Sequence, residues 1–345
     1  MTSKLPIFEM IASNYHNFNS ASLKHALIDY NAHIRKGGAM FWSVAGAMST
    51  ARLGISLAPA IRHGLVHGIS TTGANLEESL VRLLSHSKYK NEYNYRFLSR
   101  SDDEKILTDG YARVTDTLIP ESAFSKVKAL LMPRWIEANK RNERRFWHEH
   151  FYELVADARI RSHFDGDPAE CWLLAAAEMN IPIIVGGYAD SSFGNIFAAE
   201  CYKGNLSPTI IKSDIEYMMS FYDIYRKVLS KGPGAGFFQV GGGIAGDFPI
   251  CVVPSIRQDL GEAANQWAYF CQVGDSTTSY GSYSGAPPNE KITWDKLSKE
   301  TPMHMIESDA TIVVPIMLQA LIEAAAHPME LDALLTKHIA LQNRR

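Results

Sequence analysis

The sequence predicts an α/β protein built on a doubly wound, mostly parallel sheet with helices on both faces. Apolar runs of strand length alternate with segments whose apolar residues recur at helical spacing, and several runs end in turns of glycine, serine and aspartate. Parallel strands must be joined by crossover connections, usually helices, so this alternation favours a parallel sheet. The sequence holds no internal repeat and no linker rich in proline, glycine or serine, and we expect one domain over residues 1–345.

Composition limits the possible partners. Of 345 residues, 46% are hydrophobic and 21% are charged, as in an ordinary globular protein, and the net charge of −3 does not favour nucleic acid or an anionic membrane surface. The four cysteines are widely spaced and form no CxxC pair, which indicates free thiols in a reducing compartment. The first residues lack the pattern of a secretory signal, and no apolar run reaches the roughly 18 residues that span a bilayer, so we expect a cytoplasmic protein.

Two strands and the helices around them are expected in the first part of the chain. The expected elements are a helix over 18–36, a strand over 39–47, a helix over 49–64 and a strand over 65–71. The second strand ends in Thr72-Gly73-Ala74, and the spacing of Asn75 and Glu78 predicts a capping box with Asn75 as the N-cap. Such a strand, small-residue turn and helix N-terminus can hold an anionic ligand, although the same unit also occurs as a plain βα turn.

The middle of the chain is expected to be largely helical. Residues 97–120 are polar and rich in turn formers, and a long helical region over 122–160 is expected to break near Pro133. The β-rich run 181–187 is interpreted as a central strand that ends in the polar turn 188–195. Ligands of open α/β sheets collect at the carboxyl ends of such strands.

A glycine turn follows a strand in the last third of the chain. The elements expected there are a helix over 212–230, strands over 237–240, 266–276 and 303–308, and a helical tail from about 312. GGGIAG at 241–246 matches G-x-G-x-x-G directly after a strand, which is the position of a dinucleotide turn. Pro249 and the β-branched residues after it do not favour a helix, so we interpret the match as a glycine turn that allows a close approach to a ligand.

The stretch 281–296, GSYSGAPPNEKITWDK, is the strongest candidate for chemistry. It is a loop rich in glycine, serine and proline that brings Glu290, Trp294 and Lys296 close together in sequence. An indole beside an amine can keep water away from it, and a neutral lysine is a nucleophile that forms imines. On these residues alone, an exposed loop with an ordinary surface lysine is the favoured interpretation, because a reactive amine needs burial that a sequence does not show.

The chain resembles the deoxyhypusine synthase family at several motifs. The lysine loop of that family has the form SGA-x-P-x-E-x-x-x-W-x-K, and SGAPPNEKITWDK begins here at Ser284. The resemblance continues through 71–80, 97–121 and 307–317 and covers most of the chain. It implies a Rossmann-like fold that binds NAD at the carboxyl ends of its strands. The implied NAD contacts are Ser49, Thr50, Thr72, Gly73, Ala74, Glu78, Asp190, Gly242, Asp275, Ser276, Asp309 and Ala310.

The resemblance also implies an aminobutyl transferase. Family members use NAD to oxidise the secondary amine of spermidine, and their active lysine, Lys296 here, takes the aminobutyl group as an imine before an acceptor amine displaces it. We therefore expect the Lys296 amine to lie uncharged against the Trp294 ring. The implied substrate-binding positions are Glu77, Glu290, Trp294, Asn195, Asp247 and Tyr283.

Three of these positions depart from the family pattern. Asp247 stands where the family has a histidine, and Asn195 and Tyr283 stand where it has aspartates. Carboxylates bind a polycationic substrate by charge-assisted hydrogen bonds, so their replacement is enough to change the preferred amine. The acceptor is a lysine of a translation factor in family members and a free diamine in the related homospermidine synthases. A non-catalytic NAD-binding relative is the remaining alternative.

Oligomeric state and metal binding complete the expectations. The resemblance implies a homotetramer with active sites at subunit interfaces. No metal site is predicted, because His148 and His150 are two residues apart on an expected helix and do not share a face.

Overall fold

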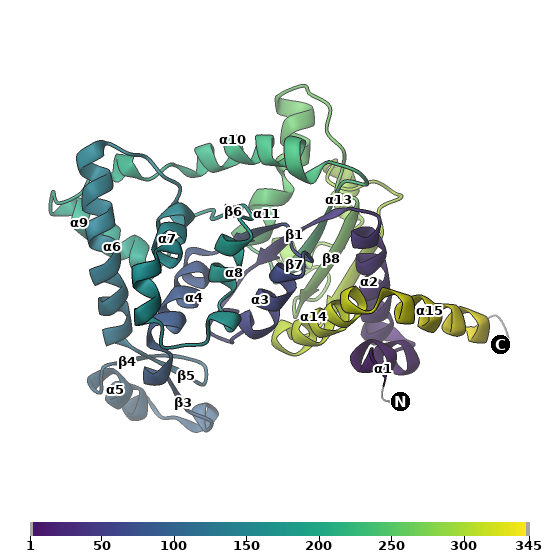
Figure 1. Cartoon of the computed structure of the whole chain (residues 1–345), viewed down its shortest axis with the longest axis horizontal. Coiled ribbons are helices and arrows are strands. Elements are labelled where there is room, and N and C mark those ends of the chain that lie inside the picture. Colours follow the sequence, from purple (N-terminus) through teal and green to yellow (C-terminus); the bar gives the residue numbers. More distant parts are fainter. Residues whose placement is uncertain (1–2, 343–345) are drawn as a thin grey trace.

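A six-stranded parallel sheet forms the centre of the molecule in the computed structural model, which describes residues 3–342 (Figure 1). Its strand order is β6-β2-β1-β7-β8-β9, and every neighbouring pair is parallel. The strands are β1 (Ala39–Val44), β2 (Gly68–Thr71), β6 (Ile183–Ile184), β7 (Ala235–Val240), β8 (Tyr269–Gly274) and β9 (Met303–Glu307). This is the strand order of dinucleotide-binding α/β folds, and the predicted fold class is confirmed.

The described chain has fifteen α-helices. They are α1 (Pro6–Asn14), α2 (Phe18–Arg35), α3 (Gly54–Arg62), α4 (Gly73–Ser85), α5 (Arg100–Thr108), α6 (Glu121–Arg141), α7 (Trp147–Ala156), α8 (Trp172–Glu178), α9 (Ser192–Tyr202), α10 (Asp214–Ile224), α11 (Ile244–Ile250), α12 (Val252–Pro254), α13 (Glu290–Thr293), α14 (Ala310–Ala326) and α15 (Pro328–Gln342). Within residues 3–342 no single helix is both long and apolar enough to cross a membrane; α14 and the start of α15 meet that test only as a pair bent by 107°.

Two adjacent residues of β1 show that both faces of the sheet are covered. Trp42 donates its indole N–H to the Tyr30 hydroxyl of α2 at 2.8 Å, whereas its neighbour Phe41 packs on Phe221 of α10 with ring centroids 4.9 Å apart. Successive side chains of a strand point to opposite faces, so α2 and α10 lie on opposite sides of the sheet. Both faces are therefore apolar, as expected for a parallel sheet, and the five residues Met40 to Val44 are all buried.

The strand order reverses between β1 and β7, at the middle of the sheet. β2 and β6 follow β1 on one side, and β7, β8 and β9 follow in turn on the other side. Connections leave the two central strands in opposite directions, which opens a crevice at their carboxyl ends. The turns after Val44 and Val240 border that crevice, and the glycine turn 241–243 follows β7 directly.

The turn-rich segment 97–120 contains regular structure that the sequence analysis missed. Helix α5 is followed by β4 (Tyr111–Val114) and β5 (Thr117–Pro120), which form an antiparallel sheet with β3 (Lys90–Asn91). Figure 1 shows this small sheet and α5 set apart from the main sheet. A capping box at Ser99 and Asp102 starts α5, and Thr115 at φ +55° makes the hairpin turn. Such local polar signals are typical of turns, which is why the segment was interpreted as turn-rich only.

The expected helix break at Pro133 is wrong. Helix α6 runs through Pro133 without interruption and ends at Asn142, which adopts the left-handed conformation with φ +50°. A proline removes one helical hydrogen bond, and burial of Leu131 and Trp135 on either side of it keeps this helix continuous.

Three further expectations need correction. The run 181–187 is not a central strand, because only Ile183 and Ile184 pair, at the edge of the sheet. The N-cap of α4 is Thr72 rather than Asn75, since the Thr72 side chain accepts the Asn75 N–H at 3.2 Å. The glycine turn does lead into a helix, α11, with Pro249 in its last turn.

The Tyr30 hydroxyl is a fully buried polar link between α2 and β1. It donates to the Leu65 carbonyl at 2.6 Å and accepts from Trp42. We expect Tyr30→Phe to lower the free energy of unfolding by about 2 kcal/mol, because both partners lose a buried hydrogen bond. Urea denaturation measures this loss. The exposed Tyr280→Phe is the control, and an equal effect of both substitutions would contradict the expectation.

Candidate active site

A cavity of about 360 Å³ lies between α11 and the lysine loop, which we define as residues 281–296. It is lined by Asp247, Cys251, Tyr283, Ala286, Glu290, Lys291, Trp294 and Lys296. Of the residues predicted from the sequence, this cavity brings together Lys296 and four of its expected neighbours in the loop and in α11. Their roles in substrate binding remain predictions, but their proximity is a property of the fold.

Lys296 is buried and ion-paired at the wall of this cavity. Its side chain is 7% exposed, and its Nζ lies 3.1 Å from Oδ1 of Asp247, whose side chain is half exposed. The same amine lies 5.5 Å from the centre of the Tyr283 ring and 5.8 Å from that of Trp294. Its position against the Trp294 ring agrees with the expectation. The expected uncharged state of this amine stays a prediction.

The glycine turn places Asp247. Gly243, at φ +63°, is the N-cap of α11, and its carbonyl accepts the Asp247 N–H at 2.9 Å. Only a residue without Cβ adopts this backbone conformation easily. Gly246 matters for another reason: a Cβ there would lie 3.0 Å from the Gln239 side chain and 3.1 Å from the Tyr283 ring. The turn thus carries Asp247 to the cavity and lets the lysine loop approach α11.

A chain of buried amides fixes the lysine loop to the sheet. The Tyr283 hydroxyl donates to Oε1 of Gln239 at 2.9 Å, and Nε2 of Gln239 donates to Oε1 of Gln272 at 3.1 Å. Nε2 of Gln272 in turn donates to the Ser284 carbonyl at 2.6 Å. Gln239 and Gln272 are paired neighbours on β7 and β8, and both are fully buried. Because every member is satisfied, the network is rigid and holds the loop in one position.

Lys291 is a second buried lysine at this cavity, and the sequence analysis missed it. Its side chain is covered by the rings of Phe270 and Tyr283, whose centres lie 4.8 and 4.9 Å from Nζ. Burial, reinforced by the charge of Lys296, lowers the pKa of Lys291 to about 8. No local pattern marks this lysine, because its burial depends on the ring of Phe270 in β8, which is 21 positions away. A lysine inside a loop already predicted to hold the active amine was the one available signal.

The remaining predicted substrate residues lie at different depths. Glu290 and Trp294 are exposed, with 66% of Trp294 accessible, so they form the mouth of the cavity. Glu77 and Asn195 do not line it. The buried Glu77 carboxylate accepts the backbone N–H groups of Ser192 and Phe193, both at 2.8 Å, at the start of α9. It holds the N-terminus of that helix, and Asn195 lies exposed one turn further on.

A separate cavity of about 470 Å³ lies at the same edge of the sheet and combines two expected NAD positions. Thr50 and Asp309 line it together with Arg52 and Arg82. Asp309 caps α14 by accepting the Thr311 N–H at 2.8 Å. Arg52 lies in the segment after β1 and Arg82 in the last turn of α4, and two guanidinium groups at one cavity suit a ligand with phosphate groups.

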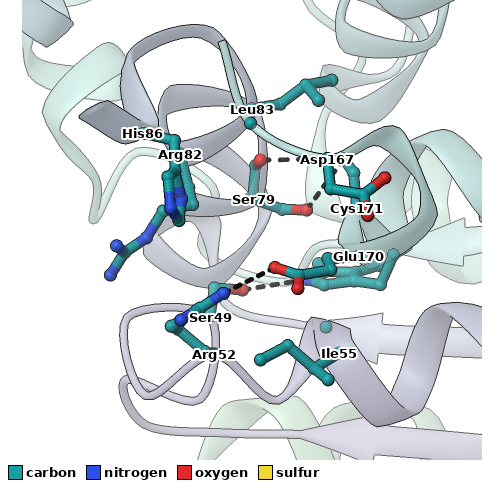
Figure 2. Close-up of a pocket in the computed structure, with 13 residues that line it drawn as sticks. Ser49, Arg52, Ile55, Ser79, Arg82, Leu83, His86, Asp167, Glu170 and Cys171 are labelled. Carbon is teal, nitrogen blue, oxygen red and sulfur yellow. Dashed lines mark hydrogen bonds and ion pairs between the residues drawn. The ribbon is translucent and has the colours of Figure 1, made fainter. Parts of the chain in front are cut away.

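A narrower pocket adjoins this one through the same two arginines (Figure 2). Figure 2 shows Arg52 ion-paired with Glu170, with 2.7 Å between NH2 and Oε2. Ser49 accepts the indole N–H of Trp172 at 2.9 Å and donates to the Asn75 carbonyl at 2.6 Å. The Ser49 hydroxyl is therefore committed to the protein, and this residue positions the turn after β1.

The other expected NAD positions follow strand ends, and two of them are packed closely against neighbouring turns. A Cβ at Gly73 would lie 2.8 Å from the Tyr188 carbonyl, and one at Gly242 would lie 2.7 Å from Ser284. Ser276 contacts the same serine, with 3.1 Å between hydroxyl oxygens. The remaining positions are Thr72 and Ala74 at the start of α4, Asp190 and Asp275 in exposed turns, and the buried Ala310. Their contacts with NAD stay predictions.

Glu78 is a buried carboxyl group near Glu77 and Tyr89. Burial, followed by repulsion from Glu77, raises the pKa of Glu78 to about 7. The Tyr89 hydroxyl donates to Oε2 of Glu78 at 3.3 Å. Near neutral pH this side chain is partly protonated and can donate a hydrogen bond as well as accept one.

Comparison with known proteins identifies the family. The family model for deoxyhypusine synthase matches residues 9–321. The chain belongs to the deoxyhypusine synthase family. Members of this family are transferases, and the resemblance seen in the lysine loop thus extends over nearly the whole chain.

Curated relatives of this deoxyhypusine synthase family member come from bacteria and archaea. A deoxyhypusine synthase-like protein of Nostoc sp. is 28% identical over 92% of this chain and 81% of its own length, and one of Thermosynechococcus vestitus is 27% identical over 91% and 77%. A probable deoxyhypusine synthase of Sulfolobus acidocaldarius is 24% identical over 91% and 92%. A putative deoxyhypusine synthase of Entamoeba histolytica has a similar crystal structure, with a TM-score of 0.52, 13% identity and 88% coverage of each chain, which supports the fold.

The raised pKa of Glu78 predicts a specific pH dependence of stability. An acid whose pKa is higher in the folded state stabilises the fold below its unfolded value, near 4.5, and this contribution is lost as the pH rises through about 7. We expect Glu78→Gln to be more stable than the wild type at pH 8, by up to about 3 kcal/mol, and nearly equal to it at pH 4.5. Chemical denaturation without NAD at both pH values measures the difference. A difference independent of pH would contradict the expectation.

Proposed function

We propose that this protein is an NAD-dependent aminoalkyl transferase that acts on a polyamine such as spermidine and carries the aminobutyl group on Lys296. The observation that supports this most directly is the buried Lys296 amine, 3.1 Å from Asp247 at the wall of a cavity large enough for an aliphatic amine. Family membership supports the transferase class. Lysine is the side chain that forms imines with carbon electrophiles, so its burial here matches that chemistry.

Asp247 is positioned to control the charge of Lys296. Nucleophilic attack requires a free lone pair on Nζ, so the ammonium must first lose a proton. Asp247 accepts that proton across the 3.1 Å contact, and its half-exposed carboxyl group can pass the proton to water. Asp247 thereby acts as the base at the position where the family has a histidine.

The transfer itself is an exchange of amines at one carbon. NAD, when bound, would supply the redox chemistry by accepting a hydride from the donor carbon and returning it to the product. Lys296 attacks the oxidised carbon, a new C–N bond forms, and the bond to the leaving diamine breaks as that amine takes a proton. An acceptor amine then attacks the same carbon and releases Lys296, so the lysine is unchanged after one cycle.

The residues at the carboxyl edge fit a dinucleotide. The cavity next to Thr50 and Asp309 contains Arg52 and Arg82, and the Nε of Arg82 has no hydrogen-bond partner within residues 3–342. Arg82 would hold a phosphate of NAD, and Asp309 would bind a ribose hydroxyl. The crevice between β1 and β7, with its glycine turn, is where such folds bind a dinucleotide.

Asp247 and Glu290 supply the negative charge for a cationic donor, and the faces of Tyr283 and Trp294 line its path. Ammonium groups bind to aromatic faces and carboxylates in such sites. The family suggests two kinds of acceptor, a protein lysine or, as in homospermidine synthases, a free diamine. The exposed mouth formed by Glu290 and Trp294 admits a small amine without rearrangement.

We further propose that the chain assembles as a homotetramer in the cytoplasm. Large apolar side chains are exposed in the loops and helix starts that follow the strands, which supports burial by another subunit there. They include Ile244, Tyr280, Trp294 and Ile312. Light scattering of the purified protein measures the assembly.

Trapping with borohydride tests the covalent step. With NAD and spermidine, we expect borohydride to add a reduced aminobutyl group to wild-type Lys296, as located by peptide mass spectrometry. Lys296→Ala is expected to show no adduct and a loss of turnover of at least about 10³-fold. The exposed Lys299→Ala is the control and is expected to behave as the wild type. Absence of an adduct in a wild-type protein that binds NAD, or an adduct on Lys291, would contradict the proposal.

Removing the Asp247 charge tests the proton transfer. We expect Asp247→Asn to lower the rate of adduct formation by about 10²–10⁴-fold and to shift the pH–rate profile upward, because water alone then has to deprotonate Lys296. Asp259→Asn, an exposed carboxylate beyond α12, is the control. An unchanged pH–rate profile in Asp247→Asn would exclude Asp247 as the base.

A further inference from the structure

We infer that the acceptor, the amine that displaces the transferred group from Lys296, also carries a carboxylate, as a basic amino acid does. Lys291 binds this carboxylate. The inference rests on the proposed function and names the substrate class of the same site. It makes Lys291 a residue that determines specificity at the known cavity.

Lys291 is an ammonium group that lacks an anionic partner. Its side chain lines the cavity and the residue is 2% exposed. Among the described residues no carboxylate oxygen lies within the 4.0 Å of an ion pair, and its one hydrogen bond, to the Ala286 carbonyl, is long at 3.5 Å. A buried cation without a counterion is costly, so a residue of this kind marks a place for an anionic ligand group.

The charges around the cavity match an amino acid better than a plain diamine. Two buried lysines face one carboxylate at the inner wall, since Asp247 is paired with Lys296 and Glu290 lies exposed at the mouth. A second ammonium on a diamine would meet Lys291 and be repelled. A carboxylate at that point would instead form a charge-assisted hydrogen bond with Lys291, while the ligand's amine reaches Lys296.

The geometry allows one small ligand to contact both lysines. Lys291 Nζ lies 4.9 Å and Lys296 Nζ lies 5.5 Å from the centre of the same Tyr283 ring. The Tyr283 hydroxyl donates to Oε1 of Gln239 at 2.9 Å, so the position of the ring beside both amines is fixed. A basic amino acid has its carboxylate and its terminal amine a few carbon atoms apart, which suits this arrangement.

Matched ligands that differ only in the carboxylate test the inference. Ornithine is putrescine with an added carboxylate, and lysine is cadaverine with one. We expect isothermal titration calorimetry, with and without NAD, to show wild-type protein binding the amino acid of each pair roughly tenfold to a hundredfold more tightly. Lys291→Met keeps the unbranched stem and removes the charge, and it is expected to abolish this preference. It should fold, because burial opposes the ammonium that it removes.

The exposed Lys299→Met is the control and should retain the wild-type preference. Equal or tighter binding of the diamines to wild type, a preference retained in Lys291→Met, or no binding of either amino acid would each overturn the inference. Binding is measured without turnover, whereas the borohydride adduct on Lys296 reports on the proposed function. If wild type forms the Lys296 adduct but does not prefer amino acids over diamines, the inferred substrate class is overturned and the proposed function is not.

Discussion

The parallel pairing of β1 with β7 is the constraint on which the site depends. Because the whole sheet is parallel, each strand delivers the segment that follows it to the same edge. The glycine turn after β7, the lysine loop after β8 and the cap of α14 after β9 meet there for this reason. Sequence positions that are far apart become neighbours without any long-range motif, and the reversal of strand order beside β1 leaves room for a ligand among them.

Within that frame, the site is set by burial of charge. Lys296 and Lys291 are both withdrawn from water, yet they are treated differently: Asp247 neutralises the first, and aromatic rings cover the second. The buried amides of Gln239 and Gln272 keep the loop that carries both lysines in register with the sheet. In the proposed mechanism, this neutral and rigid network keeps both lysines in place, so that Lys296 reacts while Lys291 selects the ligand.

The sequence predicted the fold class, because strand-length apolar runs and helical periodicity survive in any α/β protein of this size. Its failures have a common cause. Pro133 lies inside a helix and Pro249 inside another because tertiary burial outweighs the local penalty. The strand at 183–184 lies at the edge of the sheet, yet both of its residues are buried, so its apolar run resembles that of a central strand. Periodicity reports burial and does not report the order of strands.

The candidate site, like the fold, could be predicted only in part from the sequence. Motif residues such as Lys296 and Trp294 could be placed together because they are neighbours in one loop. Asp247 could be listed but its contact with Lys296 could not be derived, since it depends on how α11 folds back over the sheet edge. Glu77 was expected to bind substrate, and that role stays a prediction. The sequence did not indicate its structural contacts: its two carboxylate oxygens accept the N–H groups that open α9.

The burial of Lys291 could not be predicted from the sequence for a more general reason. A lysine is exposed in most proteins, so sequence patterns assign it to the surface by default. Its position here becomes unusual only when Phe270 from β8 and Tyr283 from the loop close over it. The assembled fold places the Lys291 side chain in the cavity wall rather than in solvent, and this adds a positive charge to the cavity. Under the inference drawn above, the identity of the amine depends on this packing, whereas the lysine motif indicates only the proposed type of bond.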